Sequence, residues 1–430
     1  MKMKIIFLLG AAIVFSSCSK LDDFHGSSNE NNDKKTPEYS HTQVIVRFEK
    51  NLSSQEKNKI RNERGIGGNF IPCSCGDPNI ELWDTDPNGG ESVEFIVEKL
   101  RGRSGAEGDL LFNISIDPID RFEPKGIPGE LNTILLTDKH EADQINIAII
   151  DSGVDFGKPF TNTPYNTPYL MKTSDFLDCN NSPTGWNFTD EGASNDILDL
   201  NGHGSMVTKI VTSELDKKSH KYSILPIKAF NQDGEGSYWN VVCAFGYLQE
   251  IQKKGAEINI INASFGKAIK KSLFHEKNLL NTMIQELDSA GVLVVTSAGN
   301  EGLDTDFGEK RHFPSGFIAD NILSVGGYSG DGNNDIEIDA LSNFGKISID
   351  VAAPFSDWII TNFDPVIDPV QGTSFSTAYV TGLIARSFIE NGRPKPIQLK
   401  TDFLNNNYGT IMYSSPLESF INSGAYVKRE

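Results

Sequence analysis

The stretch INIAIIDSGVD, residues 145–155, decides the fold, because a continuous apolar run leads directly into an acidic residue and a glycine turn. Strands that helices cover on both faces are apolar throughout, so INIAII (145–150) predicts a buried strand of a parallel sheet. Similar apolar runs recur at 223–230, 257–264, 292–298 and 321–327. Segments with helical patterns separate them, at 203–215, 239–255 and 277–291. Alternating strands and helices predict an α/β fold whose parallel strands are joined by right-handed crossovers.

Three further motifs follow this stretch: NGHGSMV (201–207), TSAGNEG (296–302) and QGTSFSTAYVTG (371–382). With Asp151, they contribute His203, Asn300 and Ser374. A serine hydroxyl is a poor nucleophile until an imidazole takes its proton, and a carboxylate fixes the tautomer of that imidazole. A side-chain amide supplies a donor for the oxyanion of the tetrahedral intermediate. Because ligands bind beyond the carboxyl ends of parallel strands, the motifs predict an acyl-transfer site at that edge.

Each of these four residues also has a purely structural interpretation. Asp151 would be explained by an Asx turn and Asn300 by another turn. His203 would be explained as a helix cap and Ser374 as a helix N-cap. The combination favours the catalytic interpretation, because the chemical role and the local context agree at every position.

The motifs and their chain order, Asp, His, Ser, resemble the subtilisin-like serine peptidases (subtilases) over about residues 128–425. The resemblance implies a three-layer αβα catalytic domain with Asp151, His203 and Ser374 as the catalytic triad. It also implies an oxyanion hole formed by the Asn300 amide and the backbone N–H of Ser374.

The same resemblance implies how a substrate binds. In the family, a peptide pairs with exposed strands, so that its backbone is read along its length. The segment that matches one such strand is Ser264, Phe265 and Gly266, and the facing wall of the S1 pocket would be Ser297, Ala298 and Gly299. One departure is Phe375, which stands after the nucleophile where many relatives carry Met.

These observations predict a secreted serine endopeptidase that hydrolyses peptide bonds through an acyl-enzyme and is made as a zymogen. We expect a monomer that acts on a protein or peptide substrate and requires no cofactor or metal. A dedicated maturation peptidase for one partner protein is an alternative. A catalytically inactive binding protein on the same scaffold is another, and the intact triad argues against it.

The first forty residues predict export and a lipid anchor. Two lysines and a short apolar run (5–15) precede Ser16, Ser17 and Cys18, as in a secretory signal. The run is too short for a transmembrane helix of about 20 residues. Cys18 at the cleavage position resembles a bacterial lipobox, which implies a lipid on its sulfur; a chance cysteine after an ordinary signal is the alternative. We therefore expect secretion across the inner membrane and anchoring at the outer membrane or cell surface.

The whole sequence divides into four parts. Residues 1–18 are the predicted lipoprotein signal with its lipidated cysteine, and 19–40 are a polar tether. Residues 41–125 alternate strand and helix patterns in a small α+β domain that resembles the propeptide of subtilases. A permanent N-terminal accessory domain is the alternative. Residues 126–430 are the predicted peptidase domain. A breaker-rich linker at 121–130 is the expected site of self-cleavage.

Composition adds limits. A net charge of −19 excludes nucleic acid as an expected partner. Asp-rich loops leave room for Ca²⁺, but no spacing names its ligands. Cys73 and Cys75 are too close to each other for an easy bridge, and Cys243 lies in an apolar helical pattern and is expected to be buried and inert. With Cys18 assigned to the lipid and only Cys179 left, we predict no disulfide framework.

Overall fold

The computed structural model describes residues 38–66, 68–85, 91–101, 105–116, 123–124, 136–137, 144–157, 169–177, 179, 182–275, 278–330, 336–360 and 369–429. The predicted signal, most of the tether, Cys18 and most of the 121–130 linker lie outside these ranges. Tyr39–Glu430 forms one compact unit.

The centre of this unit is a large, mostly parallel sheet in the order β19-β20-β18-β16-β14-β12-β7-β10-β8-β6. Its six inner strands are parallel neighbours: β18 (Val351–Pro354), β16 (Ile322–Ser329), β14 (Leu293–Ser297), β12 (Ile260–Ala263), β7 (Ile145–Asp151) and β10 (Tyr222–Lys228). Shorter strands complete it: β6 (Leu136–Thr137), β8 (Leu170–Met171), β9 (Trp186–Asn187), β17 (Glu337–Ile338), β19 (Ile411–Tyr413) and β20 (Ala425–Val427). The parallel α/β sheet that the apolar runs predicted is confirmed, and five of the six inner strands lie within two or three residues of the expected ranges.

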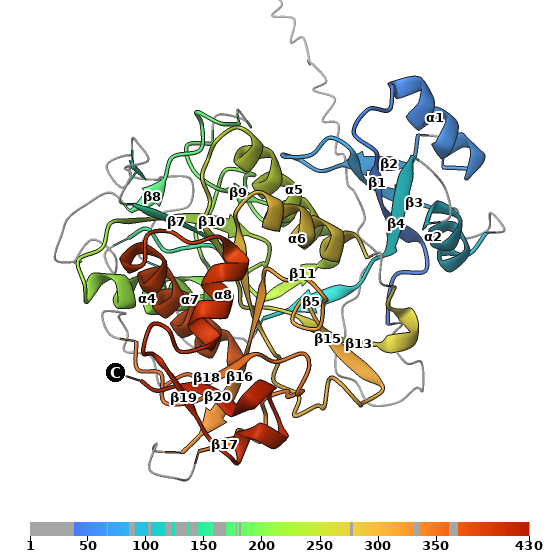
Figure 1. Cartoon of the computed structure of the whole chain (residues 1–430). Coiled ribbons are helices and arrows are strands. Elements are labelled where there is room, and N and C mark those ends of the chain that lie inside the picture. Colours follow the sequence, from blue (N-terminus) through green and yellow to red (C-terminus); the bar gives the residue numbers. More distant parts are fainter. Residues whose placement is uncertain are drawn as a thin grey trace, which may run out of the picture. The chain divides into compact units, whose positions relative to one another are not determined.

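Helices cover both faces of the sheet (Figure 1). The side chains of β7 alternate between the two layers, as the two-residue period of a strand requires. Ile145, Ile147 and Ile149 pack in one apolar cluster with α4 (His203–Asp216) and α7 (Thr373–Glu390). Ala148 and Ile150 pack in the other, with α5 (Tyr238–Lys253) and α6 (Leu279–Ser289). This part of the described chain also contains α8 (Pro396–Leu404) and the 3₁₀ turns η2 (Lys271–Leu273), η3 (Leu417–Ser419) and η4 (Asn422–Gly424). The predicted three-layer αβα arrangement is confirmed.

A four-stranded antiparallel sheet forms the N-terminal part, in the order β2-β3-β1-β4. Its elements are β1 (Gln43–Phe48), α1 (Ser54–Glu63), β2 (Phe70–Pro72), β3 (Ile80–Asp84), α2 (Val93–Arg101) and β4 (Ala106–Leu110). Helix α1 starts with a capping box in which Ser53 and Glu56 exchange hydrogen bonds. The sequence pattern did not predict β4, because the segment AEGDL is polar and contains Gly108. That glycine lies under α2, where a Cβ would come within 2.7 Å of Leu100 Cδ1.

The segment after β4 leaves the small sheet. Strand β5 (Asn113–Ser115) pairs antiparallel with β11 (Glu235–Ser237), directly before α5 (Figure 1). A last two-stranded pair joins β13 (Lys267–Lys270) and β15 (Lys310–Phe313). We call residues 39–116, which include β1 to β5, the N-terminal domain.

The cysteine prediction was wrong. Two disulfides connect the N-terminal domain to the rest of the chain, Cys73–Cys243 and Cys75–Cys179. Cys243 is buried in α5, as expected, but it is bonded and is not an inert thiol. The partners are 170 and 104 residues apart in the sequence. Their pairing follows from docking of the N-terminal domain on the catalytic part, which the cysteine spacing does not reveal.

Candidate active site

A buried carboxylate–imidazole pair forms the first half of the site. Asp151 ends β7 and His203 opens α4, and both side chains are fully buried. His203 Nδ1 lies 2.8 Å from Asp151 Oδ1 and 2.9 Å from Oδ2. The backbone N–H of Ser152 also donates to Oδ1, at 2.7 Å. With a proton on Nδ1 bonded to the carboxylate, the other ring nitrogen is the basic one.

The loop that carries His203 is held by Asp199, a residue that the sequence analysis missed. Asp199 Oδ1 accepts hydrogen bonds from the backbone N–H groups of Asn201 and Gly202, at 3.0 and 2.8 Å. Its second oxygen accepts from the N–H and the hydroxyl of Ser205. These four bonds fix the first turn of α4. The only sequence signal was an acidic residue four positions before the histidine.

Ser374 lies in the first turn of α7 and is almost fully buried. Its hydroxyl donates to the backbone oxygen of Ser264 at 3.0 Å, and the Ser264 hydroxyl donates back to the Ser374 carbonyl at 2.8 Å. N–H groups in the first turn of a helix have no acceptor within the helix, and the helix dipole makes this end positive. The Ser374 N–H therefore suits an anion beside the hydroxyl.

Thr373 orients the Asn300 amide. Asn300 Oδ1 accepts from both the backbone N–H and the hydroxyl of Thr373, each at 2.9 Å. Thr373 Oγ1 in turn accepts from the N–H of Gly299 at 3.1 Å. Because its oxygen is fixed by two bonds, the amide has a defined side on which its N–H₂ group lies. The sequence analysis assigned Thr373 no such role.

One cleft contains Ser374 and most of the predicted binding residues. Its lining includes Ser264, Phe265, Gly266, Ser297, Gly299, Asn300, Thr373 and Ser374. Ala298 is not part of it, because its side chain packs in a separate apolar cluster with Tyr328 and Ile349. The structure thus brings five of the six predicted substrate-binding residues to the nucleophile.

His312 also lines this cleft, and the sequence analysis missed it as well. Its ring fills the space between the two walls: a Cβ on Gly266 would lie 2.1 Å from the ring, and a Cβ on Gly299 would lie 2.6 Å from it. Burial lowers the pKa of His312 from 6.5 to about 4, against an opposing effect of the nearby Glu301 carboxylate. The imidazole is therefore neutral at pH 7, and its Nδ1 lies 2.9 Å from Ser315 Oγ.

The N-terminal domain reaches into the same cleft. Ser115 of β5 forms an antiparallel bridge with Gly266, and the N–H of Ile116 donates to the Gly234 oxygen at 2.9 Å. Both residues line the cleft beside Ser374. β5 thus lies between β11 on one side and Gly266 on the other, where an extended peptide would pair.

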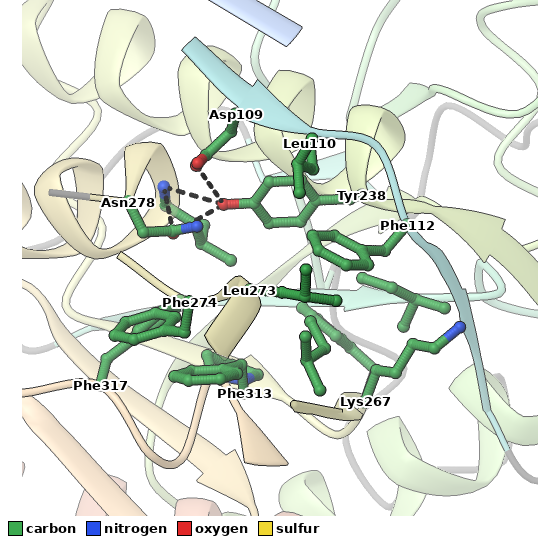
Figure 2. A pocket seen from close by; sticks show the side chains of 15 residues that line it. Asp109, Leu110, Phe112, Tyr238, Lys267, Leu273, Phe274, Asn278, Phe313 and Phe317 are labelled. Carbon is green, nitrogen blue, oxygen red and sulfur yellow. Dashed lines mark hydrogen bonds between the residues drawn. The ribbon is translucent and has the colours of Figure 1, made fainter. Parts of the chain in front are cut away.

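Figure 2 shows an apolar pocket that adjoins the cleft. Phe265 lines both of them. Phe274, Phe313 and Phe317 gather at one end of it, and β5 contributes Ile114. At the other end, Tyr238 donates to Asn278 Oδ1 at 2.7 Å and lies 3.2 Å from Asp109 Oδ2.

Within the described ranges, no three His, Cys, Asp or Glu side chains lie close enough to hold a metal ion. In the same ranges, no helix is long and apolar enough to span a bilayer.

A model of the subtilase family matches residues 142–410, well over half of the chain. The chain belongs to the subtilase family. It is a subtilisin-like serine peptidase, as the motifs predicted.

Several known proteins are similar to this subtilase. A thermophilic serine proteinase of Bacillus sp. (strain AK1) is 27% identical over 364 residues, which are 81% of this chain and 78% of the proteinase. A cuticle-degrading serine protease of Arthrobotrys oligospora is 30% identical over 205 residues, 47% of this chain and 44% of that protein. Among solved structures, a chain of the subtilase cytotoxin SubAB superposes with a TM-score of 0.50 at 17% identity, over 66% of this chain and 87% of that one. At that identity the likeness concerns the fold alone.

Proposed function

We propose that this subtilase is a secreted, lipid-anchored endopeptidase made as a zymogen. The observation that carries the catalytic part is the buried Asp151–His203 pair, with Nδ1 2.8 Å from the carboxylate, at the sheet edge where the helix of Ser374 begins. A binding protein without activity would have no need of this pair, whereas general-base catalysis by His203 requires the carboxylate that orients the imidazole.

In this proposal, the Ser374 hydroxyl turns from the Ser264 oxygen to His203 and attacks the carbonyl carbon of the substrate. His203 takes the hydroxyl proton as general base, and Asp151 stabilises the imidazolium that forms. The Asn300 amide and the Ser374 N–H donate to the oxyanion. His203 then protonates the leaving amine, and water hydrolyses the acyl-enzyme in a second round of the same proton transfers. No metal or cofactor is required for these steps.

The substrate in this proposal is an extended peptide that takes the place of β5. It would pair with β11 on one side and with Gly266 on the other, so its backbone would be recognised along its length. Alternate side chains of an extended strand point to the same side. One of them would enter the apolar pocket beside Phe265 that Ile114 now lines.

The zymogen part of the proposal rests on the place of β5. A strand that bridges Gly266 and bonds to Gly234 excludes a substrate from the same edges. Export and lipidation at Cys18 rest on the signal-like sequence alone, and cleavage in the 121–130 linker rests on its turn-forming composition.

A fluorophosphonate probe tests the catalytic proposal. We expect it to label Ser374, and Ser374→Ala to lose labelling and on the order of 10⁶-fold in kcat. Ser376→Ala is a matched control, since Ser376 lies two residues further along the same helix and its hydroxyl donates to the Pro354 carbonyl at 2.7 Å. Normal turnover by Ser374→Ala would contradict the mechanism. Digestion of casein would separate a general protease from a peptidase dedicated to one partner.

Mass spectrometry of the mature N-terminus tests the rest of the proposal. We expect a lipid-modified Cys18 and a cut within residues 121–130 in the wild type, with the uncut form accumulating in Ser374→Ala. A fully active protein that stays uncut would contradict the zymogen proposal.

A further inference from the structure

Two covalent bonds, besides the polypeptide itself, join the N-terminal domain to the catalytic part. Cys73 and Cys75 lie in one short segment after β2, and they bond to Cys243 and Cys179. Cutting the linker that follows Ile116 therefore leaves the two parts covalently connected. We propose that the disulfides hold the N-terminal domain in the cleft as a plug, and that the peptidase opens only after both the linker is cut and a thiol reductant has reduced both bridges. This inference rests on the proposed zymogen function.

The position of one bridge ties the plug to the cleft itself. Cys243 lies in α5, and β11 directly precedes that helix. β11 is the strand with which β5 pairs. The bridge at Cys243 therefore fixes the N-terminal domain to the element that borders the substrate cleft, and it leaves β5 little freedom to move away from that edge.

Noncovalent contacts of the N-terminal domain make the docked state favourable. Arg47 of β1 forms two hydrogen bonds with the Glu286 carboxylate of α6, at 3.1 and 2.7 Å. Asp109 of β4 accepts from the first backbone N–H of α6, that of Leu279, at 2.7 Å. One apolar cluster runs without a break from the N-terminal sheet into α5 and α6. Separation would expose this cluster and break the hydrogen bonds from Arg47 to Glu286 and from the Leu279 N–H to Asp109, so these contacts favour the plugged state.

The disulfides change how the plug responds to dilution. A noncovalent inhibitor leaves its enzyme when the total concentration falls below the dissociation constant. A tethered one stays at an effective concentration on the order of millimolar, whatever the dilution. One bridge is enough to keep that effective concentration high. The cleft therefore opens only when both disulfides are reduced, and reduction of only one leaves the N-terminal domain in the cleft.

The reductant that fits this step is a dithiol. Its thiolate attacks one sulfur of a bridge, the S–S bond breaks, and the other cysteine leaves as a thiolate that takes up a proton. The second thiol of the reductant then displaces the first cysteine, so the dithiol loses two electrons and becomes a disulfide. Cys73 and Cys179 are half-buried, whereas Cys75 and Cys243 are buried. Each bridge thus contains one partly exposed and one buried cysteine.

The test uses the full chain, cut in the linker by its own activity or by limited trypsin digestion. The linker offers Arg121 and Lys125 to trypsin. On gels we expect one band without reductant and two fragments with it. We expect fluorophosphonate labelling of Ser374 in the cut, oxidised protein to stay slow over about a thousandfold dilution. After reduction with dithiothreitol, the ratio of plugged to open enzyme should fall about tenfold for each tenfold dilution below the dissociation constant.

Cysteine variants separate the tether from other effects of the reductant. The double variant Cys73→Ser, Cys75→Ser should behave without reductant as the reduced wild type does, and reductant should not change it further. Each single variant keeps one bridge and should stay latent until it is reduced. If the double variant fails to fold, the reduced wild type still provides the same measurement.

Two outcomes would contradict different claims. Cut, oxidised wild type that labels as fast as the reduced protein at every dilution would overturn the plug inference and leave the peptidase function standing. Cut and reduced protein that keeps its circular dichroism spectrum but never labels would contradict the proposed peptidase function itself.

Discussion

Replacing Thr373 by Val tests whether the orientation of Asn300 sets the catalytic rate. The two side chains have the same shape, so the change deletes the hydroxyl and keeps the packing. Two hydrogen bonds are lost: the donation to Asn300 Oδ1 at 2.9 Å and the acceptance from the Gly299 N–H at 3.1 Å. The bond from the Thr373 backbone N–H to Asn300 remains.

The magnitude follows from these bonds. A neutral hydrogen bond contributes about 0.5–1.5 kcal/mol, and about 1.4 kcal/mol of lost transition-state stabilisation lowers the rate tenfold. We therefore expect kcat to fall about tenfold with KM nearly unchanged, because the amide acts on the oxyanion more than on the bound substrate. Asn300→Ala sets the upper limit, at about 10²–10³-fold, since it removes the donor altogether.

Steady-state kinetics of the cut and reduced enzyme, normalised by titration of Ser374 with the fluorophosphonate, measure this effect. Thr377→Val is the matched control: it deletes a buried hydroxyl of the same helix, which bonds to the Thr373 carbonyl at 2.7 Å. Its kcat should change little. In the Asn300→Ala background, Thr373→Val should have no further effect on kcat. An equal loss in both Val variants, or an additive loss in the double variant, would refute the proposed role of Thr373.

Three further predictions concern the cleft. His312→Gly should widen the base of the cleft, so that kcat/KM for peptides with an aromatic P1 residue, relative to peptides with Ala at P1, rises at least about tenfold. His312→Phe should not have this effect. An unchanged preference of His312→Gly across a P1 peptide series would contradict the prediction. Because the pKa of His312 is lowered from 6.5 to about 4, the unfolded chain binds this proton first as the pH falls. The free energy of unfolding should therefore fall by up to about 3 kcal/mol between pH 6.5 and 4, and denaturant titrations should show a weaker fall in His312→Gln. Phe375, whose ring centroid lies 5.4 Å from that of His203, has no thioether to oxidise, so activity should survive peroxide and Phe375→Met should make it sensitive; rapid inactivation of the wild type at a cleft residue would contradict this.

The parts of the fold that could be predicted are those in which each segment carries its own signal. A parallel strand covered on both faces is apolar throughout, and INIAII and the similar runs at 257–264, 292–298 and 321–327 became β7, β12, β14 and β16. Strand β4 carried no such signal, because AEGDL is polar and owes its place to β1 and α2. Local pattern therefore predicted the catalytic layers well and the small sheet only in part.

The site shows the same division. Asp151, His203, Asn300 and Ser374 stand in motifs, so sequence alone could propose them. Asp199, Thr373 and His312 act through hydrogen bonds and packing within the folded site. Thr373 and Asn300, for example, are 73 residues apart, and only the folded chain brings the hydroxyl to the amide. A threonine beside the nucleophile has no sequence signal that separates a positioning role from a plain helix start.

The cysteines show why the relation between the two parts of the chain could not be predicted. Cys73 and Cys75 are too close to bridge each other, and that local argument is sound. It led to a wrong conclusion because each has its partner on a surface that forms only when the N-terminal domain docks on α5. The same holds for β5, which continues the N-terminal domain in sequence but pairs with β11, about 120 residues further on. Docking of the N-terminal domain determines both the cysteine pairing and the β5–β11 strand pairing. The features that would make the enzyme latent therefore leave no signal in the local sequence patterns. Measuring activity before and after reduction therefore tests the docked arrangement more directly than any substitution within one of the two parts.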